Sequence, residues 1–317
     1  ISLASLPRAI AASLEWADDA ESQRLGLILI GVRMPRTLLG LFVGGALATA
    51  GVMMQGLFRN PLADPGLIGV SSGAALAAIA TIALGNGLAS GLTQLLGIYA
   101  LPLAAFLGGL LTTLALVAVA SRHGQIAVGT LLLTGITIAA LAGSLSGLIA
   151  YVSDDRELRD LTLWSMGSLS GASWPKVAAV LPFAVLLALL VPRLTRALNG
   201  FLLGESEAFH LGIDTERAKR TIVAATAAAV GAAVAVAGIV GFVGLVVPHL
   251  VRLLAGPDHR IVLPVSALIG GGLVVGADVV ARMVVRPAEL PLGIVMAAIG
   301  APLFLHLVLR RGVGGSE

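Results

Sequence analysis

The sequence predicts an all-α fold, a polytopic bundle of membrane-spanning helices, and three observations support this prediction. Of the 317 residues, 57% are hydrophobic and 12% are charged, whereas soluble domains carry about 25% charged residues. The mean hydropathy is +1.00, and apolar segments recur that are long enough to cross a hydrocarbon core of roughly 30 Å. Forty glycines fit the same class, because small residues let membrane helices approach closely. We therefore expect a single transmembrane domain over residues 1–317.

The apolar segments predict nine spans. One segment, residues 221–254, is too long for a single helix, and Gly238, Gly241, Gly244 and Pro248 divide it into two spans. The other seven spans are expected over residues 37–58, 67–84, 95–120, 126–152, 177–191, 261–281 and 292–309.

Polar segments separate these spans. Residues 1–32 are moderately polar and are expected to lie outside the membrane. Residues 59–66 contain two prolines, which cannot continue a helix. Residues 153–176 are charged at first and then carry Trp164 and Trp174, which are typical of a membrane interface. This stretch predicts a short interfacial helix on the periplasmic side.

The distribution of basic residues predicts the orientation. Nine spans place the two ends of the chain on opposite sides. Arg310 and Arg311 in the tail and Arg122 in a short turn then share one side, and the short connection of residues 85–94 on the other side carries no charge. Because short cytoplasmic loops are enriched in Lys and Arg, we expect the tail to be cytoplasmic.

On the expected cytoplasmic side, the longest polar stretch between spans is residues 201–220, FLLGESEAFHLGIDTERAKR. We expect two short helices here, the first (residues 207–211) capped by Ser206 and the second capped by Asp214. Gly212 lies between them, where a helix-ending glycine belongs. Such an element either binds a soluble partner or is a solvated connector, and the charges alone leave both possibilities open.

Several kinds of chemistry have no signature in the sequence. There is no cysteine, and the phosphate-binding GxxxxGK[ST], HExxH and GxSxG motifs do not occur. No two of the five histidines are spaced as a ligand pair on one helix face, so no metal site is predicted. A net charge of +3 is too small to suggest nucleic acid. An intramembrane enzyme would need a cluster of acids, His or Ser within the spans, and none is found.

Asp278 is the one acid within the predicted spans, and Arg282 follows one helical turn later. An unpaired carboxylate at the bilayer centre costs roughly 2.5–3.5 kcal/mol, so we expect a local ion pair. Proton or sodium coupling usually requires more intramembrane acids, which weighs against a secondary transporter. That class stays the alternative, because spans broken by glycine and proline also occur in it.

Five stretches carry a resemblance to a known family. They are RMPR at Arg33, QGLFRNPLADPGLIGVSSGA at Gln55, LGESEAFHLGI at Leu203, GFVGLVVPHLVRLLAGPDHRIVLP at Gly241 and AELPLGIVMAAIGAPLFLHLVLR at Ala288. Together they are similar to the permease subunit of bacterial ABC importers for iron chelates (haem, ferric siderophores) and vitamin B12, the FecCD- and BtuC-like permeases.

This resemblance implies an organisation that the residues alone do not predict. Family members have ten spans, so a further span is expected before residue 1. The resemblance also implies a homodimer in the bacterial inner membrane, with two cytoplasmic ABC ATPase subunits and a periplasmic substrate-binding protein. The chain itself would be non-catalytic and would bind no cofactor, and ATP would be used by the partner subunit.

The resemblance also implies functional residues. Arg33, Arg36 and Arg282 would dock the binding protein; without the family they would be membrane-interface arginines. Residues 201–215 would couple to the ATPase, with apolar members entering a cleft and Glu205 and Glu207 facing basic residues on its rim. The residues of this coupling set are Leu203, Gly204, Glu205, Glu207, Phe209, Leu211, Gly212 and Ile213.

A cytoplasmic gate and a cargo are implied as well. Asn60 and Leu62 match positions that narrow the exit, and Val128 stands where the cobalamin member has a polar gate residue. Residues 158–174, LRDLTLWSMGSLSGASW, resemble haem-importing members more than the others. Haem is therefore the expected cargo, and a ferric siderophore or vitamin B12 is the alternative.

Overall fold

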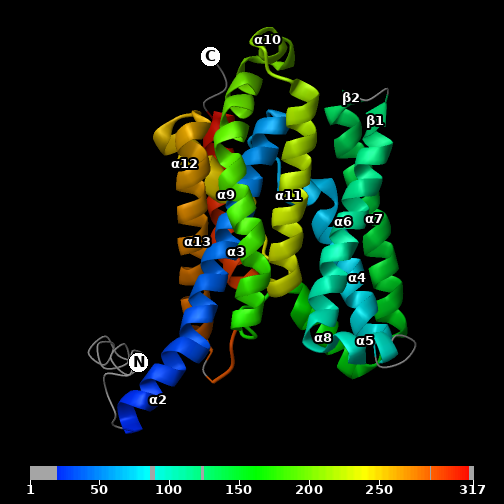
Figure 1. Cartoon of the computed structure of the whole chain (residues 1–317), viewed down its shortest axis with the longest axis vertical. Helices are drawn as coiled ribbons and strands as arrows, with labels where there is room; N and C mark the ends of the chain where they lie inside the picture. The colour runs from blue at the N-terminus through cyan, green and yellow to red at the C-terminus, as the bar shows by residue number, and fades with distance from the viewer. Residues whose placement is uncertain (1–19, 86–89, 123–124, 286, 314–317) are drawn as a thin grey trace.

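The computed structural model describes residues 20–85, 90–122, 125–285 and 287–313, and these residues are almost entirely helical (Figure 1). The prediction of an all-α helical bundle is confirmed. The expectations that concern residues 1–19, His123 and a span before residue 1 lie outside the described residues.

The helices follow one another with short connections. The α-helices are α2 (Ala20–Ile28), α3 (Met34–Phe58), α4 (Val70–Leu84), α5 (Ser90–Leu96), α6 (Ala100–Ala120), α7 (Val128–Val152), α8 (Asp155–Ser165), α9 (Trp174–Leu203), α10 (Glu205–His210), α11 (Thr215–Ala237), α12 (Val243–Ala255), α13 (His259–Val284) and α14 (Leu292–Val313). The shorter elements are a π-helical turn η2 (Leu29–Arg33), the 3-10 helices η3 (Pro65–Ile68) and η4 (Gly97–Tyr99), and the strands β1 (Ser121–Arg122) and β2 (Gln125–Ile126).

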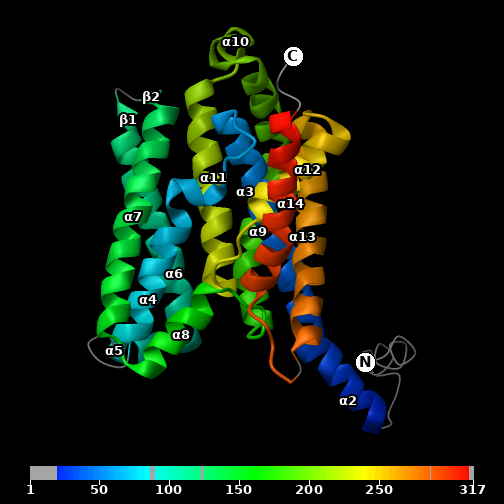
Figure 2. The ribbon, with the colours of Figure 1, turned by 180° about the vertical axis from the view of Figure 1, so that it is seen from behind.

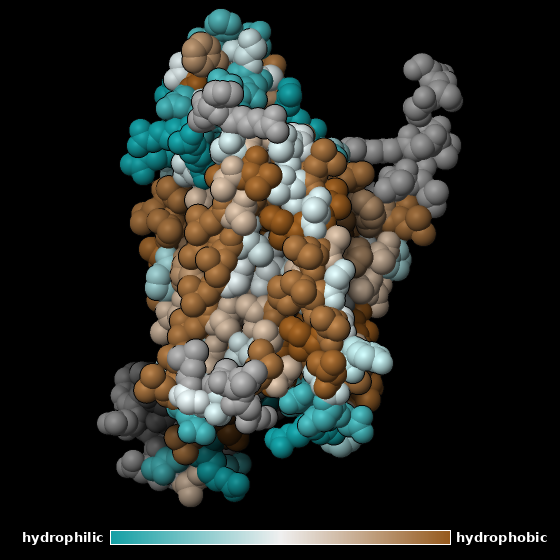
Figure 3. Space-filling model, turned by 90° about the vertical axis from the view of Figure 1, so that its right-hand side faces the viewer, coloured by the Kyte–Doolittle hydropathy of each residue, from teal (hydrophilic) through white to brown (hydrophobic). Residues whose placement is uncertain are grey.

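The bundle has two polar ends (Figures 1 and 2). One end, here called the α10 face, carries α10 and the antiparallel hairpin of β1 and β2. The other end, the α8 face, carries α5 and α8. Figure 3 shows a belt of apolar side chains between hydrophilic ends, and the long apolar helices α6 and α7 carry exposed leucines such as Leu111, Leu133 and Leu148. This pattern is that of a protein whose middle contacts lipid rather than water.

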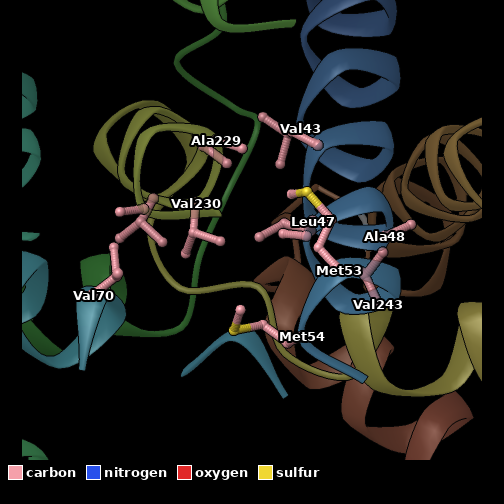
Figure 4. Packing of buried hydrophobic residues seen from close by; sticks show 14 of the residues in the cluster. Val43, Leu47, Ala48, Met53, Met54, Val70, Ala229, Val230 and Val243 are labelled. Atoms are coloured by element: carbon pink, nitrogen blue, oxygen red, sulfur yellow. The ribbon is translucent and has the colours of Figure 1, made fainter. Parts of the chain in front are cut away.

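α3 lies in the middle of the bundle, between α11 on one side and α13 on the other (Figures 1 and 2). Most of its residues are buried. In Figure 4, Val43 and Leu47 of α3 lie opposite Ala229 and Val230 of α11. Helices in lipid gain little from burying apolar surface, so close packing must hold them together. The core is accordingly rich in small side chains.

Glycines bring α3 into backbone contact with two neighbours. A Cβ on Gly44 would overlap the carbonyl of Gly270 in α13, and a Cβ on Gly51 would overlap the carbonyl of Gly244 in α12. Of the four residues expected to divide the long apolar segment, Gly238 and Gly241 lie in the break, and Gly238 ends α11 at φ 69°. The expectation is wrong for Gly244 and Pro248, because both lie inside α12.

The chain between α3 and α4 returns into the bundle. Asp64 caps η3 by accepting a hydrogen bond from Gly66 N at 2.7 Å, and Gly69 at φ 73° leads into α4. Ile68 and Val70 are buried, and Leu67 O lies against Gly135 in α7. The second span, expected from residue 67, therefore begins inside the bundle. At a rise of about 1.5 Å per residue, the 15 residues of α4 are shorter than the hydrocarbon core.

Two helices are longer than expected. α9 continues from Trp174 to Leu203 through Pro182 and Pro192, so an end at residue 191 is wrong. At the N-terminal side, residues 20–33 are helical and continue into α3 as one 39-residue segment, Ala20–Phe58. Pro35 cannot donate a backbone hydrogen bond, and the wider π-helical turn η2 precedes it. The part of residues 1–32 that is described is thus helical, and α2 projects beyond the bundle (Figure 1).

The described residues contain six helices long and apolar enough to cross a membrane and three shorter apolar helices, Val70–Leu84, Val243–Ala255 and Leu292–Leu305. Each of the nine predicted segments matches one of these helices. That all nine of these helices cross the membrane stays a prediction. Within residues 153–176, α8 forms behind a capping box of Asp154 and Glu157, and its interfacial position also stays a prediction.

Candidate functional site

The polar loop of residues 201–220 folds into the end of α9, the short helix α10 and the start of α11. α10 begins at Glu205 behind Gly204, whose φ of 117° suits glycine. The cap expected at Ser206 is therefore wrong, because Ser206 is already inside the helix. The cap at Asp214 is confirmed, since its carboxylate accepts a hydrogen bond from Arg217 N at 2.9 Å. Gly212 separates the two helices at φ 77°.

One side of α10 is fastened to α9. Ala208 is fully buried, and Ile213 N donates to its carbonyl at 3.1 Å. The Ile213 side chain fills the space above Gly200, where a Cβ would overlap its Cδ1. Ile213 is thus half-buried against its own chain, and its entry into a cleft of a partner stays a prediction.

The other side of this element is apolar and exposed. Leu203 and Phe209 are each 66% exposed, and Leu211 is 57% exposed. The helix α10 itself lies at the extreme end of the bundle (Figure 1). Because Ala208 and Ile213 fasten the helix from behind, these three side chains are presented on a supported element.

Lys219 forms a buried ionic cluster beside α10. Its Nζ lies 2.6 Å from Glu205 Oε1 and 2.5 Å from Glu216 Oε1, and it donates to Ile126 O at 3.0 Å. Glu205 was expected to face basic residues of a partner, and the structure instead directs it to Lys219. Glu207 is exposed, as that expectation requires.

A second ionic network lies at the α8 face. Arg36 of α3 donates from Nε and Nη2 to Asp278 of α13 at 2.8–3.1 Å, and from Nη1 and Nη2 to Glu289 at 3.0 and 2.8 Å. Arg282 Nε lies 3.2 Å from Asp278 Oδ2, so the expected local ion pair is confirmed. The buried carboxylate of Asp278 thus has two arginine partners, and the nearer one is 242 positions away.

The three arginines expected to dock a binding protein lie in different surroundings. Arg36 is 13% exposed and holds two carboxylates of its own chain, whereas the Arg282 side chain is 35% exposed. Arg33 is exposed at the end of η2. The docking role stays a prediction for all three, and the structure makes Arg33 and Arg282 the more accessible.

A pocket of about 900 Å³ opens on the α10 face between the hairpin, the end of α3, α10 and α11. Val128, the first residue of α7, lines this pocket. Asn60 and Leu62 lie on an exposed turn beside α3, outside the pocket lining, and Asn60 Oδ1 accepts from Leu62 N at 2.9 Å. Their role as a gate stays a prediction.

Comparison with known proteins places the chain in a family. A model of the FecCD transport family matches residues 2–310. The chain belongs to this family. The prediction made from the motifs is confirmed, and the chain is a multi-pass membrane permease of the FecCD family.

Three relatives illustrate the likeness. The hemin transport permease HmuU of Yersinia pestis is 45% identical over 90% of this chain and 84% of its own length. The cobalamin import permease BtuC of Halobacterium salinarum is 42% identical over 98% of this chain and 80% of its own length. A solved structure of a metal-chelate type ABC transporter in an inward-facing conformation has a TM-score of 0.82 and 32% identity, and the match covers 96% of this chain and 97% of that one.

Two residues of these ionic clusters have contacts that the sequence did not predict. Lys219 is one charge of the polar stretch of residues 201–220, and Glu289 belongs to the stretch that begins at Ala288. One signal was available for Lys219, which follows Glu216 by three positions on a helix and so faces it. The contacts to Glu205 and Ile126 had no local signal.

The Arg36 network predicts a pH dependence. Hydrogen bonding to Arg36 lowers the pKa of Glu289 from its ordinary value of 4.5. A carboxylate with a lowered folded-state pKa stabilises the fold above its ordinary pKa, and this contribution is lost as the pH falls through the lowered value. Glu289→Gln is therefore expected to lower the melting temperature at neutral pH. The difference from the wild type should shrink as the pH falls below the ordinary pKa of 4.5 and through the lowered folded-state pKa, and a difference independent of pH would contradict the assignment.

Proposed function

We propose that this FecCD-family chain is the membrane permease of an ATP-driven importer that carries a large metal chelate, most specifically haem, into the cytoplasm. The observation that carries the proposal is the segment of residues 203–213 around α10, which presents three exposed apolar side chains, Leu203, Phe209 and Leu211, on a base held by the buried Ala208. A permease without a phosphate-binding motif must receive work through a contact surface. In this proposal the α10 face is cytoplasmic, and two ABC ATPase subunits bind the α10 elements of a homodimer in the inner membrane.

The assignment of the cargo is supported by different observations. The HmuU relative is named for hemin transport and the BtuC relative for cobalamin import. The similarity of residues 158–174 to haem importers favours haem, and the 42% identity to BtuC over 98% of the chain supports cobalamin as the second candidate. Both are large ring-shaped metal chelates, so one pathway of similar width suits either.

The test is transport by vesicles that contain the permease, its ATPase and its binding protein. Haem, a ferric siderophore and cobalamin are offered separately, with and without ATP. ATP-dependent uptake of haem alone supports the full proposal, and uptake of cobalamin alone corrects the cargo. ATP-independent uptake driven by a proton or sodium gradient would contradict the proposal and would show that the protein is a secondary transporter.

Phe209→Ala is expected to weaken ATPase binding or to uncouple hydrolysis from transport. Buried aromatic anchors commonly contribute about 2 kcal/mol or more to an interface, which corresponds to a loss of roughly 30-fold in affinity. The measurement is ATPase binding to the detergent-solubilised permease. Tyr151→Ala serves as the control, because Tyr151 is an aromatic residue at the other end of the bundle and is even more exposed than Phe209, 88% against 66%. If the Phe209→Ala variant bound the ATPase and coupled hydrolysis to transport as the wild type does, the main contact with the ATPase would be made by another residue.

Charge reversal at Arg33 and Arg282 is expected to slow docking of the binding protein on the α8 face. Exposed charges act mainly on the association rate, and their effect grows as salt is removed. The measurement is the association rate of Arg33→Glu/Arg282→Glu at two salt concentrations. Arg36 is left unchanged in this variant, because its reversal would disturb the fold. An unaltered rate at low salt would leave these arginines as membrane-interface residues.

A further inference from the structure

Lys219 is a buried cation that joins three separate elements. Lys219 is 3% exposed, and its ammonium group carries three N–H donors. The three acceptors are Glu205 Oε1 in α10, Glu216 Oε1 in α11 and the carbonyl of Ile126 in β2. A buried charge is costly unless it is paired and hydrogen-bonded, so all three elements stabilise its position.

Ile126 is held by both of its backbone groups. Its carbonyl accepts from Lys219, and its N–H donates to Glu216 Oε2 at 2.8 Å. Its side chain is 2% exposed. Ile126 pairs with Ser121 in the hairpin, and Val128, which lines the pocket, is two positions further along and begins α7.

The cluster therefore connects α10 with the first turn of α7. Glu205 is the first residue of α10, and the path from it through Lys219 to Ile126 runs along the lining of the pocket. Figure 1 shows α10, the start of α11 and the hairpin at the same end of the bundle. Moving α10 alone would separate Glu205 from a buried ammonium group. Because such separation is unfavourable, the hairpin and α7 should follow α10.

We propose that Lys219 is a positioning residue that transmits movement of α10 to the hairpin and the N-terminal end of α7. This inference rests on the proposed function, in which an ATPase moves α10, and it adds the residue through which the movement reaches the pocket. The role assigned to Glu205 changes with it, from contact with a partner to contact with Lys219.

The experiment uses the complete transporter in lipid nanodiscs and vesicles. The variants are Glu205→Gln, Lys219→Met, Lys219→Arg and the double variant Glu205→Gln/Lys219→Met. Arg217→Gln is the matched control, because Arg217 is an exposed charge on the same turn of α11. Three quantities are measured: ATPase binding, cargo transported per ATP hydrolysed, and the ATP-induced signal of a spin label at Ala127→Cys. The chain has no native cysteine, so a permease labelled before the other subunits are added carries one label in each chain.

We expect Glu205→Gln and Lys219→Met each to lower cargo per ATP by about tenfold, within the usual range of coupling between sites. ATPase binding should be unchanged, and the spin label should lose its response to ATP. The double variant should be no worse than either single variant, and Lys219→Arg should retain part of the coupling. Arg217→Gln should behave as the wild type.

Other results would overturn the inference. Glu205→Gln with full coupling and a normal spin-label response would show that the link carries no movement. If Glu205→Gln weakened ATPase binding, Glu205 would contact the ATPase directly, as the resemblance implied. Glu205 is half exposed, so this variant tests the inference even if Lys219→Met does not fold. Absence of ATP-driven transport by the wild type would refute the proposed function instead.

Discussion

Arg36→Met is expected to lower the free energy of unfolding by about 3 kcal/mol or more, as is usual when one partner of a buried ion pair is removed. The Asp278 side chain is 7% exposed, and without Arg36 its one remaining ion-pair partner among the described residues is Arg282, 3.2 Å away. Glu289 would lose its two hydrogen bonds to Arg36. The measurement is unfolding of the detergent-solubilised protein, followed by circular dichroism against increasing denaturant.

Two further variants make this prediction specific. Arg24→Met removes an exposed arginine of α2 and should change stability by less than about 0.5 kcal/mol. Arg36→Met/Asp278→Leu removes both charges of this buried pair and should recover part of the loss, because an apolar pair of similar volume often replaces a buried ion pair at little cost. If Arg36→Met were as stable as the wild type, Arg282 alone would suffice for Asp278.

Gly51→Ala is expected to destabilise the packing of α3 against α12 by about 2 kcal/mol, a usual cost of overpacking a close contact. The new Cβ would overlap the carbonyl of Gly244 and would lie 2.6 Å from its Cα. Backbone atoms cannot move aside as a flexible side chain can, so the two helices must separate. Unfolding in detergent measures the loss.

Gly272→Ala is the matched control for this substitution. Gly272 is also inside a helix of the bundle, but a Cβ there meets nothing within 4 Å. Alanine is favoured over glycine in a helix by roughly 0.5–1 kcal/mol, so this variant should be as stable as the wild type or slightly more. Equal stability of both variants would mean that α3 and α12 are less closely packed than the structure indicates.

Local rules identified the helices and several of their ends. Lipid offers no hydrogen bonds to the backbone, so each long apolar run must form a helix, and every predicted span has a helical counterpart. Asp214 as a cap, and Gly212 and Gly238 as breaks, follow from side-chain and φ preferences within one turn. The five sequence motifs were sufficient to identify the family to which the chain belongs.

Tertiary contacts decided the rest. Pro192 and Pro248 are inside helices because neighbouring helices hold the backbone in place despite the lost hydrogen bonds. Gly244 reads as a break in the sequence, and only its contact with Gly51 shows it to be a packing residue. The partners of Asp278 and Lys219 include Arg36 and Ile126, which lie 242 and 93 positions away. A charge in a helix indicates that it needs a partner, and only the packing of the helices determines which residue that partner is.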